Sequence, residues 1–233
     1  MTRSRLSTAT VTAACALALT ALGTGGADAA DPRVAPGGNF DLSVWQLQEP
    51  VGSPGKPTTI PSSRLQGPNG YQDAYFYTDT RDGAMTYGSA ADWALAGSHR
   101  MSATLRVVSV TRNVCVGQIH LGSGGSSTKP LVELYYHANG DIVLGTEDSP
   151  SGGQTQHPVG HVSVGKTWSY TIAVSGGNTV ELTVNGATSR YTIPSAFKPY
   201  KQYFKAGSYN QSSSDSTTDG ARVAFYGLTV SHR

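Results

Sequence analysis

Residues 169–195, SYTIAVSGGNTVELTVNGATSRYTIPS, decide the fold class. Polar and apolar side chains alternate over 169–175, 179–186 and 189–195, and the turn sequences SGGNT (175–179) and NGAT (185–188) separate these runs. Alternation with a period of two is typical of a strand with one buried face, and Asn-Gly tolerates the positive φ of a tight hairpin. This stretch therefore predicts three antiparallel strands joined by hairpins.

The same pattern recurs along most of the chain, and helical periodicity is nearly absent. Further strands are predicted at 101–110, 114–122, 130–138, 141–146, 203–211 and 221–231, with an Asn-Gly hairpin at 137–141. SGGQTQ (151–156) and NQSSSDSTTDG (210–220) are interpreted as polar loops. Many short strands separated by turn signals predict an all-β jelly-roll sandwich of two antiparallel sheets. We expect one sheet to be curved, with an exposed concave groove.

The N-terminal segment has the pattern of a secretory signal peptide. Arg3 and Arg5 precede an apolar run that ends at Ala27-Asp28-Ala29, an A-x-A cleavage site. We predict a signal peptide over 1–29, a short leader over 30–36 and one domain over 37–232. The apolar run is too short for a membrane span, so we expect a secreted, extracellular protein with no membrane partner.

Cysteine content and charge narrow the function classes. Of the two cysteines, Cys15 lies in the signal peptide, so Cys115 has no disulfide partner and is expected to be a buried thiol. The net charge is +2, and removal of two Arg and one Asp with the signal peptide lowers it to +1. A nucleic-acid-binding protein would show a basic stripe, so none is expected as a partner. The chain has four Glu residues, which makes a carboxylate-rich site hard to assemble.

Two segments combine a polar strand face with an apolar one. In YFKAGSYNQ (203–211), strict alternation places Tyr203, Lys205, Tyr209 and Gln211 on one face. In VGQIHLG (116–122), it places Gln118 and His120 on one face, together with Val116. These side chains offer hydrogen-bond donors, aromatic rings and an imidazole that titrates near neutrality. They suit an anionic, sugar-like polymer.

Other site chemistries lack their motifs. No cluster has the spacing of metal ligands, and no pair of carboxylates suggests glycoside hydrolysis. Neither a nucleophile elbow nor a phosphate-binding glycine loop occurs in the right context. Proton chemistry in the groove would therefore depend on tyrosine and histidine.

Four segments in order, NFDLSVWQLQEP (39–50), YFYTDTRDGAMTY (75–87), VGQIHLG and YFKAGSYNQ, resemble polysaccharide lyase family seven, the alginate lyases. The resemblance covers nearly all of the predicted mature chain. It implies a secreted jelly roll that cleaves an acidic polysaccharide by β-elimination without a cofactor or metal. We expect the protein to be a monomer.

The resemblance also implies residue roles. Gln118 would help to neutralise the substrate carboxylate, which stabilises the enolate-like intermediate. Tyr209 would be the acid and, for some sugars, also the base; His120 would be the base for the opposite stereochemistry, or a neutraliser. Lys205 would bind the substrate carboxylate, with Tyr203 and Gln211 as further substrate contacts. The ordinary pKa of tyrosine is about 10, and Lys205 on the same face is expected to favour the phenolate.

One family element is missing. The family's R-S-E-L-R strand, whose first Arg binds the carboxylate, is absent near residues 87–91. Arg100 is a candidate replacement if it faces the groove, although an outward position would leave it in solvent. Three functions stay open: a polyuronate lyase, a non-catalytic carbohydrate-binding sandwich, and a glycoside hydrolase on a similar fold. The sequence leaves the choice among mannuronate, guluronate and glucuronate open, and that between internal and terminal cleavage.

Overall fold

The computed structural model describes Trp45 and residues 47–49, 58–60, 92–122, 129–211 and 220–233. The predicted signal peptide and leader, and residues 87–91, where the family's R-S-E-L-R strand is expected to be missing, lie outside the described residues. Almost all of the regular structure is β-strand. The elements in chain order are β1 (Leu47–Glu49), β2 (Thr58–Ile60), β3 (Ser98–Val110), β4 (Asn113–Leu121), β5 (Pro130–His137), β6 (Asp141–Glu147), β7 (Gln154–His161), β8 (Thr167–Ser175), β9 (Thr179–Val184), β10 (Ala187–Thr192), a 3-10 turn (Ser195–Phe197), β11 (Gln202–Asn210) and β12 (Ala221–His232).

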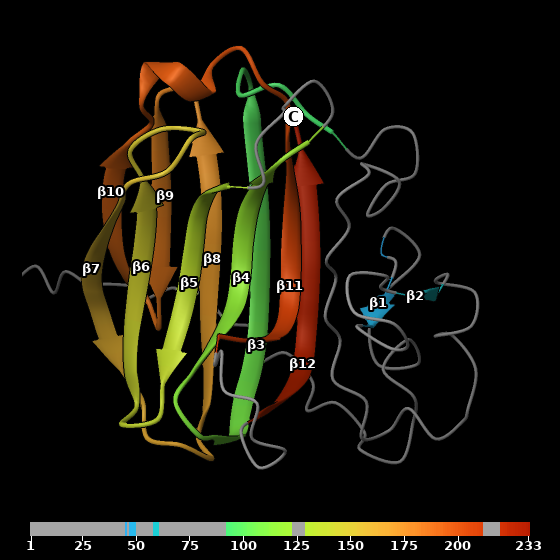
Figure 1. Cartoon of the computed structure of the whole chain (residues 1–233), viewed down its shortest axis with the longest axis vertical. Coiled ribbons are helices and arrows are strands. Elements are labelled where there is room, and N and C mark those ends of the chain that lie inside the picture. The colour runs from blue at the N-terminus through green and yellow to red at the C-terminus, as the bar shows by residue number, and fades with distance from the viewer. Residues whose placement is uncertain (1–44, 46, 50–57, 61–91, 123–128, 212–219) are drawn as a thin grey trace, which may run out of the picture.

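Two antiparallel five-stranded sheets form the body of the fold (Figure 1). One sheet has the strand order β10-β9-β8-β3-β12, and the other has the order β11-β4-β5-β6-β7. β1 and β2 pair separately. Apolar side chains of both sheets meet in one core, with Met101 and Leu105 from β3 and Ile119 from β4 fully buried. The prediction of a two-sheet jelly-roll sandwich is confirmed. Among the described residues, no helix is long and apolar enough to cross a membrane.

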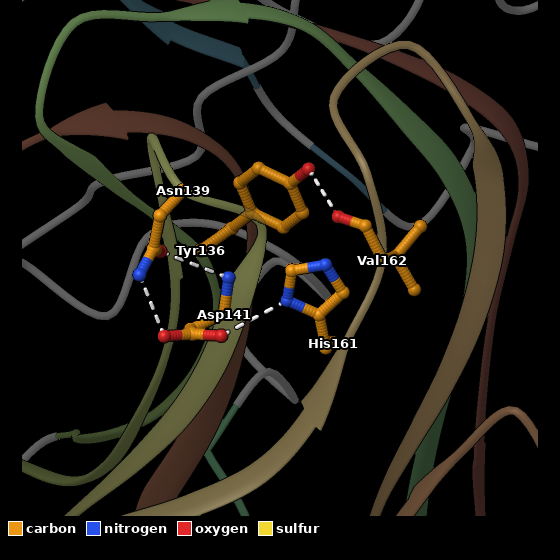
Figure 2. A network of polar contacts seen from close by, with 5 residues as sticks. All are labelled: Tyr136, Asn139, Asp141, His161 and Val162. Atoms are coloured by element: carbon orange, nitrogen blue, oxygen red, sulfur yellow. Dashed lines mark hydrogen bonds and ion pairs between the residues drawn. The ribbon is translucent and has the colours of Figure 1, made fainter.

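The hairpins form where the turn sequences predict them. Asn185 and Gly186 adopt φ values of 46° and 90°, which two-residue hairpin turns require. At the β5–β6 hairpin, the Asn139 amide donates to Asp141 at 2.7 Å, and His161 of β7 contacts the same carboxylate at 2.9 Å (Figure 2). The hydrogen bond from His161, followed by that from Asn139, holds the pKa of Asp141 below its usual value. These contacts tie β7 to the hairpin.

The strand β7 corrects one prediction. The polar composition of residues 151–156 predicts a loop, yet a strand begins at Gln154 and continues through Pro158 to His161. Its side chains are mostly exposed, so the alternation that identifies a half-buried strand is missing. β7 is the edge strand of its sheet, where a proline that cannot donate a ladder hydrogen bond is tolerated.

Register irregularities occur in both β4 and β11, and the one in β4 changes the face expected for Val116. The register of β4 against β5 shifts between Cys115 and Gly117, and that of β11 against β4 shifts between Ala206 and Tyr209. Val116 consequently belongs to the core, whereas strict alternation had placed it beside Gln118. A β-bulge inserts one extra residue and re-aims the side chains that follow it.

Gly117, which lies at the β4 bulge, has no room for a side chain. A Cβ atom there would lie 2.7 Å from the hydroxyl oxygen of Tyr170, which is buried and donates to the Val116 carbonyl at 2.8 Å. We expect Gly117→Ala to lower the free energy of unfolding by about 1–3 kcal/mol, because overpacking forces these groups apart. Urea unfolding would measure the loss. Gly220→Ala is the control, since its Cβ would meet nothing within 4 Å; equal stability of the two variants would contradict the prediction.

A histidine pair joins the outer ends of β3 and β12. The Nδ1 atoms of His99 and His232 are 2.7 Å apart, and the ring of Trp93 stacks on His99. His99 Nε2 donates to the Ala96 carbonyl at 2.7 Å, so the neutral His99 ring accepts through Nδ1. Burial, followed by the proximity of His99, lowers the pKa of His232 from its ordinary 6.5.

This pair gives stability a pH dependence near neutrality. The folded state binds fewer protons than the unfolded state as the pH falls through 6.5, so the free energy of unfolding should decrease over that range. Urea unfolding at several pH values on both sides of 6.5 would measure the slope. His232→Gln should reduce it, because it removes the group whose pKa is lowered on folding. An unchanged slope in His232→Gln would contradict the assignment.

Candidate active site

The candidate site lies on the outward side of the sheet β11-β4-β5-β6-β7. We call this side the polar face, defined by Cys115, Gln118, His120, Glu133, Tyr135, Glu147, Gln154, Lys205 and Tyr209. Their strand neighbours Ile119, Val132 and Leu144 point the other way, into the core. The polar side chains therefore occupy one side of strands whose other side holds the sandwich together.

The register aligns the candidate residues in rows across the strands. Lys205 of β11 pairs with Gln118 of β4, which pairs with Glu133 of β5. Tyr209 likewise pairs with Cys115. Residues directly opposite each other on antiparallel strands have neighbouring side chains. The structure thus brings Gln118, Lys205 and Tyr209 together from positions about ninety residues apart in the chain.

A shallow, open pocket lies between β4 and β11. Its lining includes Gln118, Lys205 and Tyr209, together with Cys115 and the small residues at 117, 206 and 207. Tyr209 is 39% exposed, whereas Gln118 and Lys205 are almost fully buried. Among the described residues that line the pocket, Lys205 is the one cation. The pocket therefore offers a phenol, an amide and an ammonium group to a ligand.

His120 lies one row further along β4. Its Nδ1 is 3.0 Å from the carbonyl oxygen of Leu121, and its ring lies against Tyr203, with 5.4 Å between ring centroids. Since a carbonyl only accepts, Nδ1 carries a proton and Nε2 carries the lone pair of the neutral ring. The ring is therefore held with Nε2 as the nitrogen able to act as a base.

Other residues assigned to substrate binding have different placements. Tyr203 is 1% exposed and supports both the His120 ring and the Lys205 ammonium, whose nitrogen lies 5.5 Å from the Tyr203 ring centre. Gln211 lies just beyond β11, and its amide donates to the Tyr209 carbonyl at 3.4 Å. Tyr203 thus contacts His120 and Lys205, and Gln211 contacts Tyr209. Direct contact of Tyr203 and Gln211 with substrate stays a prediction.

Arg100 does not belong to this site, which corrects the expectation that it binds substrate. It lies on β3 in the opposite sheet and is exposed, whereas its neighbour Met101 points into the core. Alternation along β3 therefore directs Arg100 to the outer surface of the other sheet.

Cys115 is an inert thiol on the pocket floor. It is 2% exposed, and its pKa is raised well above the usual value by burial and then by Glu133. A neutral thiol is a poor nucleophile. The prediction of a buried, structural cysteine is confirmed.

A network of acidic and amide side chains extends the site across β5, β6 and β7. Glu133 accepts hydrogen bonds from Gln118 Nε2 at 2.6 Å, from Gln154 Nε2 at 3.1 Å and from the Tyr135 hydroxyl. Gln154 Nε2 also lies 2.9 Å from Glu147 Oε1. Burial and then the charge of Glu133 raise the pKa of Tyr135, so its phenol stays protonated and donates.

The sequence patterns described above do not predict this network. Although the chain has four Glu residues, two of them, Glu133 and Glu147, share one amide of Gln154. The alternation of Glu133 and Tyr135 with Val132, Leu134 and Tyr136 was the available signal. Neither carboxylate lines the pocket, so they do not form the acid–base pair of a glycosidase. Among the described residues, no His, Cys, Asp and Glu group could hold a metal ion.

The chain is a two-sheet jelly roll with Gln, His, Lys and Tyr side chains on the outer face of one sheet. The family model for alginate lyases matches residues 40–92 and 86–232, and the chain belongs to this family. The two matched segments overlap at residues 86–92, and the sequence contains no R-S-E-L-R pattern there.

Similar proteins agree with this assignment. An alginate lyase of Klebsiella pneumoniae is 25% identical over 282 residues, which cover 85% of this chain and 91% of the relative. That alignment is longer than the chain itself, so the relative has segments that this chain lacks. The crystal structure of an alginate lyase from Pseudomonas aeruginosa is 29% identical with a TM-score of 0.69, covering 83% of this chain and all of the other.

A third comparison concerns alginate lyase A1-II′, of polysaccharide lyase family 7. A crystal structure of this enzyme is 26% identical with a TM-score of 0.70, and it covers 85% of this chain and 99% of the other. A variant of the same enzyme, with a histidine replaced by asparagine and a tyrosine by phenylalanine, was solved in complex with substrate. The protein described here is thus a polysaccharide lyase acting on an acidic polysaccharide.

Proposed function

We propose that the protein is secreted and cleaves alginate or a related glucuronan by β-elimination, giving unsaturated oligosaccharides. The observation that carries this proposal is the placement of Gln118, His120, Lys205 and Tyr209 on the adjoining strands β4 and β11. Support also comes from the substrate complex of the similar enzyme in which a histidine and a tyrosine were replaced.

The chemistry assigns each side chain a task. The C5 proton of a uronate becomes acidic when hydrogen-bond donors and a positive charge stabilise the enolate-like form of its carboxylate. Lys205 and the Gln118 amide supply these groups in the pocket. His120 Nε2 or the Tyr209 phenolate removes the proton, according to the sugar's stereochemistry, and the Tyr209 phenol protonates the leaving glycosidic oxygen.

The predicted signal peptide supports secretion. Secretion also fits the substrate, since a polymer too large to enter the cell must be cleaved outside it.

The sequence lacks the family's R-S-E-L-R pattern and therefore its carboxylate-binding Arg. Lys205 must then supply more of the positive charge that stabilises the substrate carboxylate. Loss of a charged hydrogen bond to a carboxylate costs about 1.5–3 kcal/mol, or roughly tenfold to a hundredfold in rate. A non-catalytic carbohydrate-binding protein is the second candidate, and it is favoured by the same deletion.

Ultraviolet absorbance separates the two candidates. The purified mature protein is mixed with polymannuronate, polyguluronate, mixed alginate and glucuronan. Absorbance should rise with at least one polymer, because elimination creates a double bond conjugated to the carboxylate. A hydrolase would release reducing ends without this absorbance. A flat trace with all four polymers, with binding retained, would replace the proposal by the binding function.

A further inference from the structure

Glu133 is a buried carboxylate surrounded by donors, and it is absent from the reaction as proposed above. It is 9% exposed and accepts hydrogen bonds from three side chains on three strands: Gln118 of β4, Tyr135 of β5 and Gln154 of β7. An ionised carboxylate can only accept, and each of these groups donates to it. The arrangement is therefore complete with Glu133 charged.

Glu133 determines which way the Gln118 amide points. The oxygen and nitrogen of a glutamine amide are nearly the same size, and packing alone distinguishes them poorly. A carboxylate 2.6 Å away does distinguish them, because it attracts the NH₂ group and repels the carbonyl oxygen. One N–H of the Gln118 amide thus donates to Glu133, and the second N–H of the same nitrogen remains able to donate to a ligand.

The structure also fixes Glu133 itself. Gln154 holds one carboxylate oxygen from the edge strand, and its side chain crosses the position of Gly145, where a Cβ atom would lie 2.6 Å from the Gln154 amide carbon. The Tyr135 hydroxyl binds the same oxygen. A fixed acceptor can orient its partner, whereas a mobile one would only follow it.

We propose that Glu133 is a positioning residue that orients the Gln118 amide toward the substrate carboxylate. This inference rests on the function proposed above, in which Gln118 stabilises the enolate-like intermediate. It has an unusual corollary, because Glu133 places a negative charge near the binding site of an anionic polymer. Glu133 therefore favours turnover while it opposes binding.

The kinetic signature follows from these opposing effects. Glu133→Gln keeps the size of the side chain but removes the charge and the preference for one Gln118 orientation. We expect kcat to fall about tenfold, as for loss of one oriented transition-state interaction, while KM stays unchanged or decreases. A general loss of structure would also lower the apparent kcat, but it would lower the melting temperature as well, so the melting temperature is measured for each variant.

Glu181→Gln is the matched control. Glu181 lies on β9 in the opposite sheet and accepts a hydrogen bond from Arg190 at 2.8 Å. The same chemical change there should leave kcat and KM as in the wild type. A similar fall of kcat in both variants would overturn the proposal.

A double-mutant cycle tests whether Glu133 acts through Gln118. In a Gln118→Ala background, Glu133→Gln should change kcat by less than about twofold, because the oriented amide is already gone. If Glu133→Gln lowers kcat by the same factor with and without Gln118, the residue has another role and the proposal is wrong.

An NMR measurement decides the contact without any activity. The Gln118 side-chain amide protons, assigned by their loss in Gln118→Ala, should include one that is shifted downfield and exchanges slowly with solvent. Glu133→Gln should remove this shift and Glu181→Gln should not. If no polyuronate is cleaved but the shift behaves in this way, the proposed function fails and the orienting contact stands. If Glu133→Gln leaves the amide signals unchanged, the positioning role is overturned.

Discussion

Tyr209→Phe should lower kcat at least a hundredfold while the affinity for the polymer changes no more than a few fold. The change deletes the hydroxyl of Tyr209, the one aromatic residue among the described residues that line the pocket, and its side chain is exposed. That hydroxyl is the group proposed to protonate the leaving oxygen, and a positioned acid or base contributes about 10²–10⁴-fold. The ring remains, so packing against the sugar and the fold should both persist.

The measurement compares the initial rate of ultraviolet absorbance with polymer binding determined by calorimetry. Tyr226→Phe is the control, because Tyr226 lies on β12 in the opposite sheet, beneath the Arg106 guanidinium. It should keep the wild-type rate. Full turnover by Tyr209→Phe would assign the acid to another residue, with His120 the next candidate to substitute.

Lys205→Gln should lower kcat/KM tenfold to a hundredfold, which corresponds to about 1.5–3 kcal/mol for a charged hydrogen bond. Lys205 is the one cation among the described residues that line the pocket, and its electrostatic effect reaches Cys115 beside it. The substitution keeps a hydrogen-bond donor but removes the charge. Lys205→Arg should recover part of the loss, since it restores the charge with a different shape.

Salt dependence provides the second readout for this variant. Raising the ionic strength should weaken wild-type activity more than that of Lys205→Gln, because screening acts on charge pairs. Lys201→Gln is the matched control: Lys201 is exposed and immediately precedes β11. If both lysine variants lose activity equally, the effect comes from the overall charge of the protein and the specific role of Lys205 is wrong.

The sequence predicts the strands of this fold well where they are half buried. Every alternating run from residue 101 onward corresponds to a strand, because one face of each packs into the core. β7 was missed since an edge strand exposed on most positions has no reason to alternate. The bulges in β4 and β11 were also missed, because an extra residue follows from how two strands pair and leaves little trace in either strand alone.

The sequence predicts the motif residues of the site, but it does not predict which other side chains surround them. Gln118, Lys205 and Tyr209 do line one pocket, as the polar strand faces indicate. Arg100 was excluded only when the topology assigned β3 to the other sheet. The partnership of Gln118 with Glu133 depends on a cross-strand register that residue types do not specify. Long-range pairing, rather than local pattern, therefore determines which side chains surround the reacting groups.

The two-sided character of β4 has a consequence for how such an enzyme diversifies. Its inward side chains Val114, Val116 and Ile119 are fully buried in the core, whereas Gln118 and His120 on its other side are not members of that core. Substitution on the outward side leaves the apolar packing between the two sheets in place, so most variants there should still fold. In a combinatorial library limited to outward positions of β4 and β11, the variants should therefore differ mainly in their sugar preference. By the same reasoning, evolution can change the preferred polymer without compensating mutations in the core.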